Sequence, residues 1–208
     1  YKVANVWGGD EGTTLMLAAF CATLAAGLGR RADTARRPGA VIAGLIASWY
    51  AATALWLAPF AATPPDWLAG SPSQGMNVHL VKIWMLLHAP LVLTAYAWIL
   101  YLVVPAFAAL GGALASWPAP ARTQARRAWA VLSAGIGFGM IWAFEDPMYG
   151  QVWHWDPVQT AVFAVWCFLT AHLHGLVLWR AGRIGWRWAP VTGVLAAVTA
   201  AAAMAVTR

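Results

Sequence analysis

The chain has 208 residues, of which 62% are hydrophobic and only 10% are charged. A soluble domain usually carries about 25% charged residues, so the composition excludes an ordinary soluble protein and indicates a single membrane domain over residues 1–208. The net charge of +6 does not indicate nucleic-acid binding, because the basic residues are confined to alternate loops between apolar segments.

Six apolar segments are long enough to cross a hydrocarbon core, which takes about 20 helical residues. Helices are expected, because lipid offers no partner to an unpaired backbone amide. The sequence therefore predicts an all-α integral membrane protein with six transmembrane helices. These cover residues 12–29, 39–60, 80–105, 128–144, 158–179 and 188–206.

The charges predict the orientation of these helices. Ten of the thirteen Lys and Arg residues fall in the first, third and fifth loops, where Asp33 is the only acid. Because an excess of Lys and Arg marks cytoplasmic loops, both chain ends are expected on the outer side of a bacterial-type inner membrane. Membrane topology accounts for the basic loops without any further role.

The chain begins with Tyr1 and not with Met, and no signal peptide is visible, so the true N-terminus is expected to lie outside this sequence. Cys21 and Cys167 both fall inside predicted helices and form no CxxC motif. The chain is therefore expected neither to carry a redox disulfide nor to attach haem covalently.

Two outer loops are distinctive. Residues 61–79 are rich in Pro, Gly and Ser, which is typical of an irregular loop. Residues 145–157, between the fourth and fifth helices, contain a run of aromatic and polar side chains before a helix start predicted by Asp156 and Pro157. An interfacial aromatic belt would also account for tryptophan here. The run is Trp153, His154, Trp155 and Asp156.

Histidines are the candidate metal ligands, since neutral imidazole is a usual axial ligand of haem iron. A membrane histidine can also hydrogen-bond across helices, and position alone leaves both interpretations open. At 1.5 Å per residue, His88 lies about 9 Å beyond Lys82 and His174 about 9 Å from Arg180. The two histidines therefore belong to opposite leaflets and would serve different haems.

The other histidines are weaker candidates. His172 is two residues from His174 and points in a different direction around the helix, so at most one of them faces a given cofactor. His79 and His154 lie at or near the outer surface, where they would contact haem propionates or only contribute polarity.

Residues 149–175, YGQVWHWDPVQTAVFAVWCFLTAHLHG, resemble the WWD signature of the haem-handling family of cytochrome c biogenesis proteins. Residues 1–17, which include Trp7, and residues 83–97, which include His88, resemble segments of the CcmF-type haem lyase subunits. The CcsA and CcmC types are similar in the WWD segment (149–157). The signature positions that match are Trp153, Trp155, Asp156, Pro157, Trp166 and His174.

The chain also departs from the family pattern. Tyr149 and Val152 replace tryptophans, and Gln159 replaces an acid. The family's second outer histidine, expected after the sixth helix, is absent, as is a membrane partner for His174. Either the chain is part of a longer or split protein, in which a second chain would supply the missing ligands, or the fold is reused without the full ligand set.

The resemblance implies a haem-handling subunit that presents haem at the outer face to a CxxCH apocytochrome c, together with other maturation subunits. His88 would ligate the presented haem, Trp153 and Trp155 would stack on it, and Asp156 would order the loop. His174 would hold a haem b in the membrane. Whether the chain is part of a haem lyase enzyme stays open.

Two other functions remain open from the sequence. The fold would also suit a haem b electron-transfer subunit that anchors a respiratory complex, which the missing histidines favour. A membrane scaffold or transporter component without a cofactor is the third interpretation.

Overall fold

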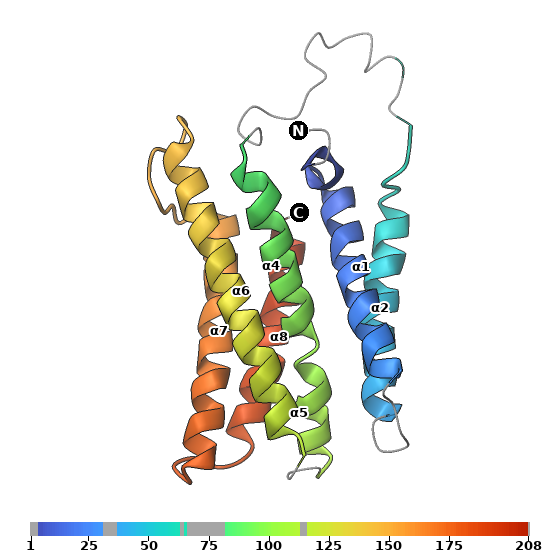
Figure 1. Ribbon diagram of the computed structural model, residues 1–208, viewed down its shortest axis with the longest axis vertical. Coiled ribbons are helices and arrows are strands. Elements are labelled where there is room, and N and C mark those ends of the chain that lie inside the picture. Colours follow the sequence, from blue (N-terminus) through green and yellow to red (C-terminus); the bar gives the residue numbers. More distant parts are fainter. Residues whose placement is uncertain (1–3, 31–36, 63–64, 66–81, 113–115, 208) are drawn as a thin grey trace.

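The computed structural model describes residues 4–30, 37–62, 65, 82–112 and 116–207. All regular elements in these residues are helices, and six spans are long and apolar enough to cross a membrane, which confirms the predicted fold class (Figure 1). The elements are η1 (Ala4–Trp7), α1 (Asp10–Gly29), α2 (Arg37–Trp56), α4 (Trp84–Leu100), α5 (Val103–Leu110), α6 (Pro118–Glu145), α7 (Pro157–Arg180) and α8 (Trp188–Val206). Helices α4 and α5 together form one span.

The helices form two groups that share one core. Helices α1 and α2 pair as an antiparallel hairpin beside the group formed by α4, α6, α7 and α8, and both ends of the described chain lie at the same end of the bundle (Figure 1). Packing of α1 against α4 joins the groups. Small buried side chains, among them Ala95, Ala128, Ala196 and Ala200, allow the helix backbones to approach closely.

The third predicted helix is interrupted after Leu100. Proline lacks the N–H that would bond the carbonyl four residues earlier, and its ring crowds that carbonyl. Pro105 therefore cannot donate to the Tyr101 carbonyl and crowds it, and the α-helix breaks at Tyr101. The buried Tyr101 hydroxyl lies 2.8 Å from the Cys21 carbonyl and 2.9 Å from the Ala43 carbonyl. It therefore ties the break to both helices of the α1–α2 hairpin.

Two other boundaries differ from the prediction. Helix α2 ends at Trp56 and not near residue 60, because Pro59 disfavours helical backbone at Ala58, which has a φ of 50°. Helix α6 begins at Pro118, ten residues before the predicted start. Its 28 residues exceed the roughly 20 needed to cross the hydrocarbon, so its first turns lie beyond the apolar segment that hydropathy detects.

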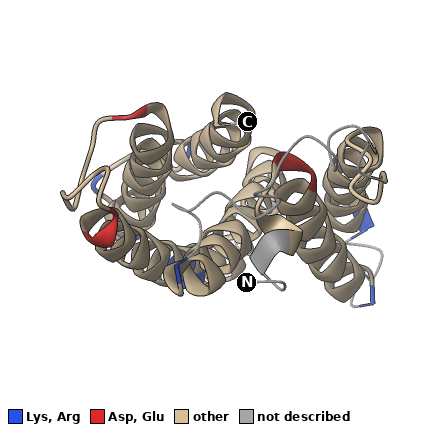
Figure 2. Cartoon of the chain, turned by 90° about the horizontal axis from the view of Figure 1, so that it is seen from above, with Lys and Arg blue, Asp and Glu red and all other residues tan. Residues whose placement is uncertain are grey.

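Charges separate along the bundle axis. Figure 2, viewed along this axis, shows that charged residues are few among the helices. Every described acid lies where α1 begins, where α6 ends or in the loop before α7, and we call this the acidic end. The opposite end carries all described arginines, at the end of α1, the starts of α2 and α6, and the α7–α8 connection, and we call this the basic end.

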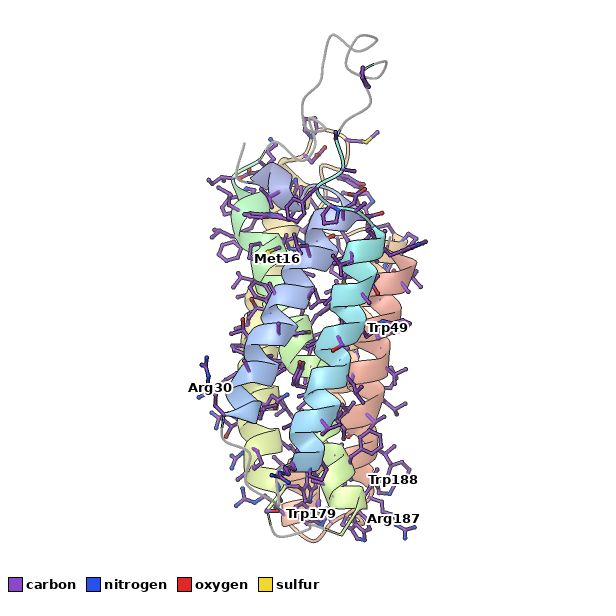
Figure 3. The ribbon with its side chains drawn as sticks, turned by 90° about the vertical axis from the view of Figure 1, so that its right-hand side faces the viewer. Met16, Arg30, Trp49, Trp179, Arg187 and Trp188 are labelled. Carbon is purple, nitrogen blue, oxygen red and sulfur yellow. The ribbon has the colours of Figure 1, made fainter. Side chains whose placement is uncertain are left out.

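The outward faces of the helices are apolar. On the α2 side, Trp49 is 70% exposed and Trp56 is 82% exposed, and Trp49 projects from the bundle in Figure 3. Exposed apolar surface of this extent is typical of a membrane-facing surface. Candidate sites therefore have to be sought where polar groups enter the bundle.

Candidate functional site

A cavity of about 1020 Å³ lies at the acidic end. Helices α4, α6, α7 and α8 form most of its wall, and the loop between α6 and α7 contributes the remainder together with Thr13 of α1. Ligand cavities usually span about 300–1,000 Å³ and are mostly apolar with a few placed polar groups. The polar residues of the lining are Thr13, His88, Tyr96, Asp146, Tyr149, Asp156, Gln159 and Thr207.

His88 is the histidine of this cavity. Its Nδ1 lies 2.8 Å from the Gly135 carbonyl of α6. Because a carbonyl oxygen only accepts, Nδ1 carries the ring proton and Nε2 keeps its lone pair. The ring also meets Trp142 edge-on, with 5.7 Å between centroids. His88 therefore has a fixed tautomer and a constrained orientation at the cavity wall.

Glycine makes room for this ring. A Cβ at Gly139 would lie 2.8 Å from both Cε1 and Nδ1 of His88, and one at Gly135 would lie 2.9 Å from Val92 Cγ2. Gly135 and Gly139, one turn apart on α6, thus leave room for side chains of α4. The sequence contained this signal, as small residues spaced by four in a membrane helix, but only the packing links it to His88.

The first turn of α4, just before His88, is held from two sides. Trp7 donates its indole N–H to the Met85 carbonyl at 3.3 Å, so η1 is anchored against α4. Trp84 donates to the Glu145 carboxylate at 2.7 Å, which joins the start of α4 to the end of α6. Trp7 lies in the segment that resembles the CcmF-type subunits and was a weaker candidate for cofactor binding; here it supports the helix that carries His88.

The loop before α7 separates its two tryptophans. Trp153 is partly buried and lines the cavity, whereas Trp155 is 74% exposed and does not. Their rings are edge-to-face, with centroids 5.7 Å apart. The Trp153 Nε1–H is buried without a hydrogen-bond partner among the described residues. A buried donor without a partner costs about 1–3 kcal/mol, so a ligand that accepts from it would be stabilised.

Asp156 begins α7 as predicted. Its side chain accepts from the Gln159 N–H at 2.8 Å, and the Gln159 side chain accepts from the His154 N–H at 2.5 Å. This reciprocal arrangement is a variant of the capping box, in which residues three apart satisfy free amides at a helix start. Gln159, noted in the sequence only as a departure from the family, therefore orders the loop.

Asp146 and His154 complete the loop. Asp146 is buried, lines the cavity and accepts from the Met148 N–H at 2.8 Å. The His154 ring packs edge-on against Tyr149 with centroids 4.9 Å apart, and its Nε2 is buried without a partner among the described residues. The sequence did not predict that Asp146 lines the cavity, because an acid beside a helix end is usually a solvent-exposed charge.

Aromatic contacts continue from the loop along α7. Phe163 packs edge-on against Trp153 and stacks on Trp166, with centroids 5.7 Å and 6.0 Å apart. Trp166 lies 5.9 Å from Trp129, whose indole N–H donates to the Thr170 hydroxyl at 2.9 Å. Rings in contact thus connect the cavity to the turn of α7 that precedes His174.

The two histidines of α7 face different surroundings. His172 is buried against α8, and its Nδ1–H donates to the Ala189 carbonyl at 2.8 Å. His174 is exposed, and its Nδ1–H donates to the Thr170 carbonyl at 2.9 Å. A ligand for His174 would therefore come from outside the described bundle. His79 lies outside the described residues.

The cavity fits a haem group. Haem iron needs only axial ligands from protein, and His88 offers Nε2, while the apolar wall suits a porphyrin. The partnerless Trp153 N–H suits an acceptor such as a propionate. The arrangement can thus bind and orient a flat, amphipathic metal complex near the end of the bundle.

Comparisons with known proteins point to one family. The profile of the family described as cytochrome C assembly protein matches residues 12–204. The cytochrome c-type biogenesis protein CycK of Rhizobium meliloti (strain 1021) is 31% identical over 185 residues, and CcmF of Pseudomonas aeruginosa is 31% identical over 187. CcmF of Escherichia coli (strain K12) is 30% identical over 190.

These alignments cover 86% of this chain but only 27–28% of the relatives. The chain thus spans less than a third of the length of the relatives it matches. No solved structure matches it significantly.

Proposed function

Because the chain belongs to the family of cytochrome c assembly proteins, we propose that it serves cytochrome c maturation by holding haem in the cavity at the acidic end. From there the haem is presented to an apocytochrome c with a CxxCH motif. The observation that carries this proposal is His88, held at the wall of a cavity of about 1020 Å³ with its Nε2 available.

Residues of this chain bind and orient the haem. His88 would hold the haem iron through Nε2, and a second histidine would come from a partner chain or a further segment. Trp153 covers the porphyrin from the loop and donates its indole N–H to a propionate. Bound haem supplies the vinyl groups to which the cysteine thiols of the apocytochrome add. Asp156 and Gln159 keep the loop in one conformation through their hydrogen bonds.

Trp155 has a different role in this proposal. Its ring is 74% exposed beside Trp153. Exposed tryptophan is a frequent anchor at protein interfaces. Trp155 would therefore lie beside the bound haem and contact the incoming apocytochrome or another maturation subunit.

His174 is proposed as a ligand of haem b. Its Nδ1–H is occupied by the Thr170 carbonyl, an arrangement common in histidines that ligate metal through Nε2. Since the side chain is exposed on α7, the second axial histidine would come from a neighbouring helix of the complete protein or from a second chain.

The proposed setting is a bacterial-type inner membrane with the acidic end on the periplasmic side. All described arginines lie at the opposite end, as expected for the cytoplasmic side of a membrane protein. In this orientation the cavity lies on the side where the apocytochrome is folded.

The test is spectroscopic. The protein is purified in mild detergent with its partner chains, and its haem is measured by reduced-minus-oxidised and pyridine haemochrome spectra. We expect a b-type signal that falls in His88→Ala and in His174→Ala, and that stays in the buried control His172→Leu. A parent protein that folds but lacks haem would contradict the proposal.

A maturation assay in a deletion strain separates the proposal from its strongest competitor. The aromatic contacts between the cavity and Thr170 would also suit a haem b electron-transfer subunit of a respiratory complex. Such a subunit is not needed for cytochrome c maturation. Restoration of maturation by the parent chain, but not by Trp153→Ala with Trp155→Ala, supports the haem-presenting function.

A further inference from the structure

A second, smaller pocket lies at the basic end, between α6 and α7. Its volume is about 220 Å³, and it is lined by two arginines and two aliphatic residues. Arg122 comes from the second turn of α6, and Arg180 is the last residue of α7. Leu176 and Val177 form the wall on the side of the membrane interior.

The two guanidinium groups lack a counter-charge in the described part of the chain. Neither Arg122 nor Arg180 has a hydrogen bond or an ion pair to a described residue, and every described acid lies at the opposite end of the bundle. The start of α6 and the end of α7 meet at this pocket, and their opposite partial charges offset each other, so the two guanidinium groups determine its charge. The pocket is therefore a site of positive charge that an anion would neutralise.

The depth and the apolar wall narrow the type of anion. Arg180 ends the membrane span of α7, so the pocket lies at the level of lipid headgroups. Leu176 is buried, whereas Val177 is 59% exposed toward the membrane side. The wall is backed by the pair Trp117 and Trp179, with centroids 5.4 Å apart, and Trp179 lies at this end of the bundle in Figure 3. A ligand with an anionic head and an apolar tail can contact the two arginines and the aliphatic wall at the same time.

We propose that this pocket binds an anionic phospholipid, with the phosphate between Arg122 and Arg180 and an acyl chain along Val177. Arginine binds phosphate oxygens through paired, charge-assisted N–H donors. Basic pockets between membrane helices are suited to anionic headgroups. The lipid would join the start of α6 to the end of α7, two of the four helices that line the cavity at the acidic end.

Native mass spectrometry of the complete protein in detergent tests the proposal. Phosphatidylglycerol is titrated against phosphatidylcholine with the same acyl chains, and inorganic phosphate is added as a competitor. The variants are Arg122→Gln and Arg180→Gln, with Arg180→Lys to retain the charge. The matched control is Arg183→Gln, which removes an exposed arginine from the same end of the bundle that does not line the pocket.

We expect one phosphatidylglycerol to bind with preference over phosphatidylcholine. Loss of one charge-assisted contact should weaken this binding about tenfold in Arg122→Gln and in Arg180→Gln. Arg180→Lys should fall between Arg180→Gln and the parent, and Arg183→Gln should match the parent.

Three results would overturn the proposal. Equal weakening by Arg183→Gln would mean that the lipid is attracted by the general charge of this end. Equal binding of the two lipids would remove the preference for an anionic headgroup. Displacement of the lipid by millimolar inorganic phosphate would identify a site for free anions.

Discussion

The His88 Nδ1–H donates to the Gly135 carbonyl at 2.8 Å, and this bond links α4 to α6 inside the cavity. The same tautomer is held by backbone carbonyls at His172 and at His174. All three rings are thus in the form that ligates iron through Nε2. Their surroundings differ: His88 lines a cavity, His172 is packed against α8, and His174 is exposed.

Substitution Gly139→Ala tests whether the position of His88 matters for haem. The added Cβ would lie 2.8 Å from the His88 ring, so the ring must rotate away from Gly135. Supporting contacts of a metal ligand are typically worth about 10–100-fold in affinity. We expect at least about tenfold weaker haem retention, measured by the Soret absorbance against added imidazole, with the helical content unchanged.

Gly137→Ala is the control for Gly139→Ala. It lies on the same helix, and its Cβ would meet no atom within 4 Å. Haem retention should equal that of the parent. If both variants lost haem alike, the cause would be the helix backbone and not the His88 ring.

Substitution Gly12→Ala should displace η1. The added Cβ would overlap the Val6 carbonyl oxygen, which requires backbone movement and should break the bond from Trp7 to Met85. Overpacking of this kind costs about 1–3 kcal/mol. Thermal unfolding in detergent, followed by circular dichroism, should occur at a lower temperature. The control is Gly27→Ala, which has open space at its Cβ. It should leave the unfolding temperature unchanged or raise it slightly.

Substitution Gln159→Ala should loosen the loop that carries Trp153. The variant loses the acceptor for the His154 N–H, worth about 1 kcal/mol, which corresponds to about a fivefold larger open population. Limited proteolysis of the loop should quicken accordingly. Gln159→Glu retains an acceptor at the same position and should behave like the parent. A loop cleaved equally fast in both variants would contradict the capping role.

Substitution Tyr101→Phe should weaken the attachment of the α1–α2 hairpin. It removes the hydroxyl shared by the Cys21 and Ala43 carbonyls, and hydrogen bonds of this kind contribute about 1 kcal/mol in a membrane. The free energy of unfolding, measured by titration with sodium dodecyl sulfate, should fall by this amount. Tyr50→Phe is the control, because the Tyr50 side chain is buried and its hydroxyl has no hydrogen-bond partner among the described residues. Equal losses would assign the effect to packing.

Hydropathy and charge predicted the architecture well, because both report on the solvent around each segment. The six spans, the helix start at Asp156 and the segregation of charge all follow from local sequence. Helix ends were less predictable. The break at Tyr101 depends on Pro105 together with the bonds to α1 and α2, and the early start of α6 lies in residues too polar for hydropathy to detect.

The sequence by itself determined that this chain crosses a membrane, where its histidines lie along the helices and which loop is rich in tryptophan. Only the tertiary structure decided that His88 lines a cavity, that Trp153 faces inward while Trp155 faces outward, and that glycines of α6 make room for the imidazole. The reason is physical: hydrophobicity acts on each segment independently, whereas the orientation of a side chain depends on packing against residues distant in the chain.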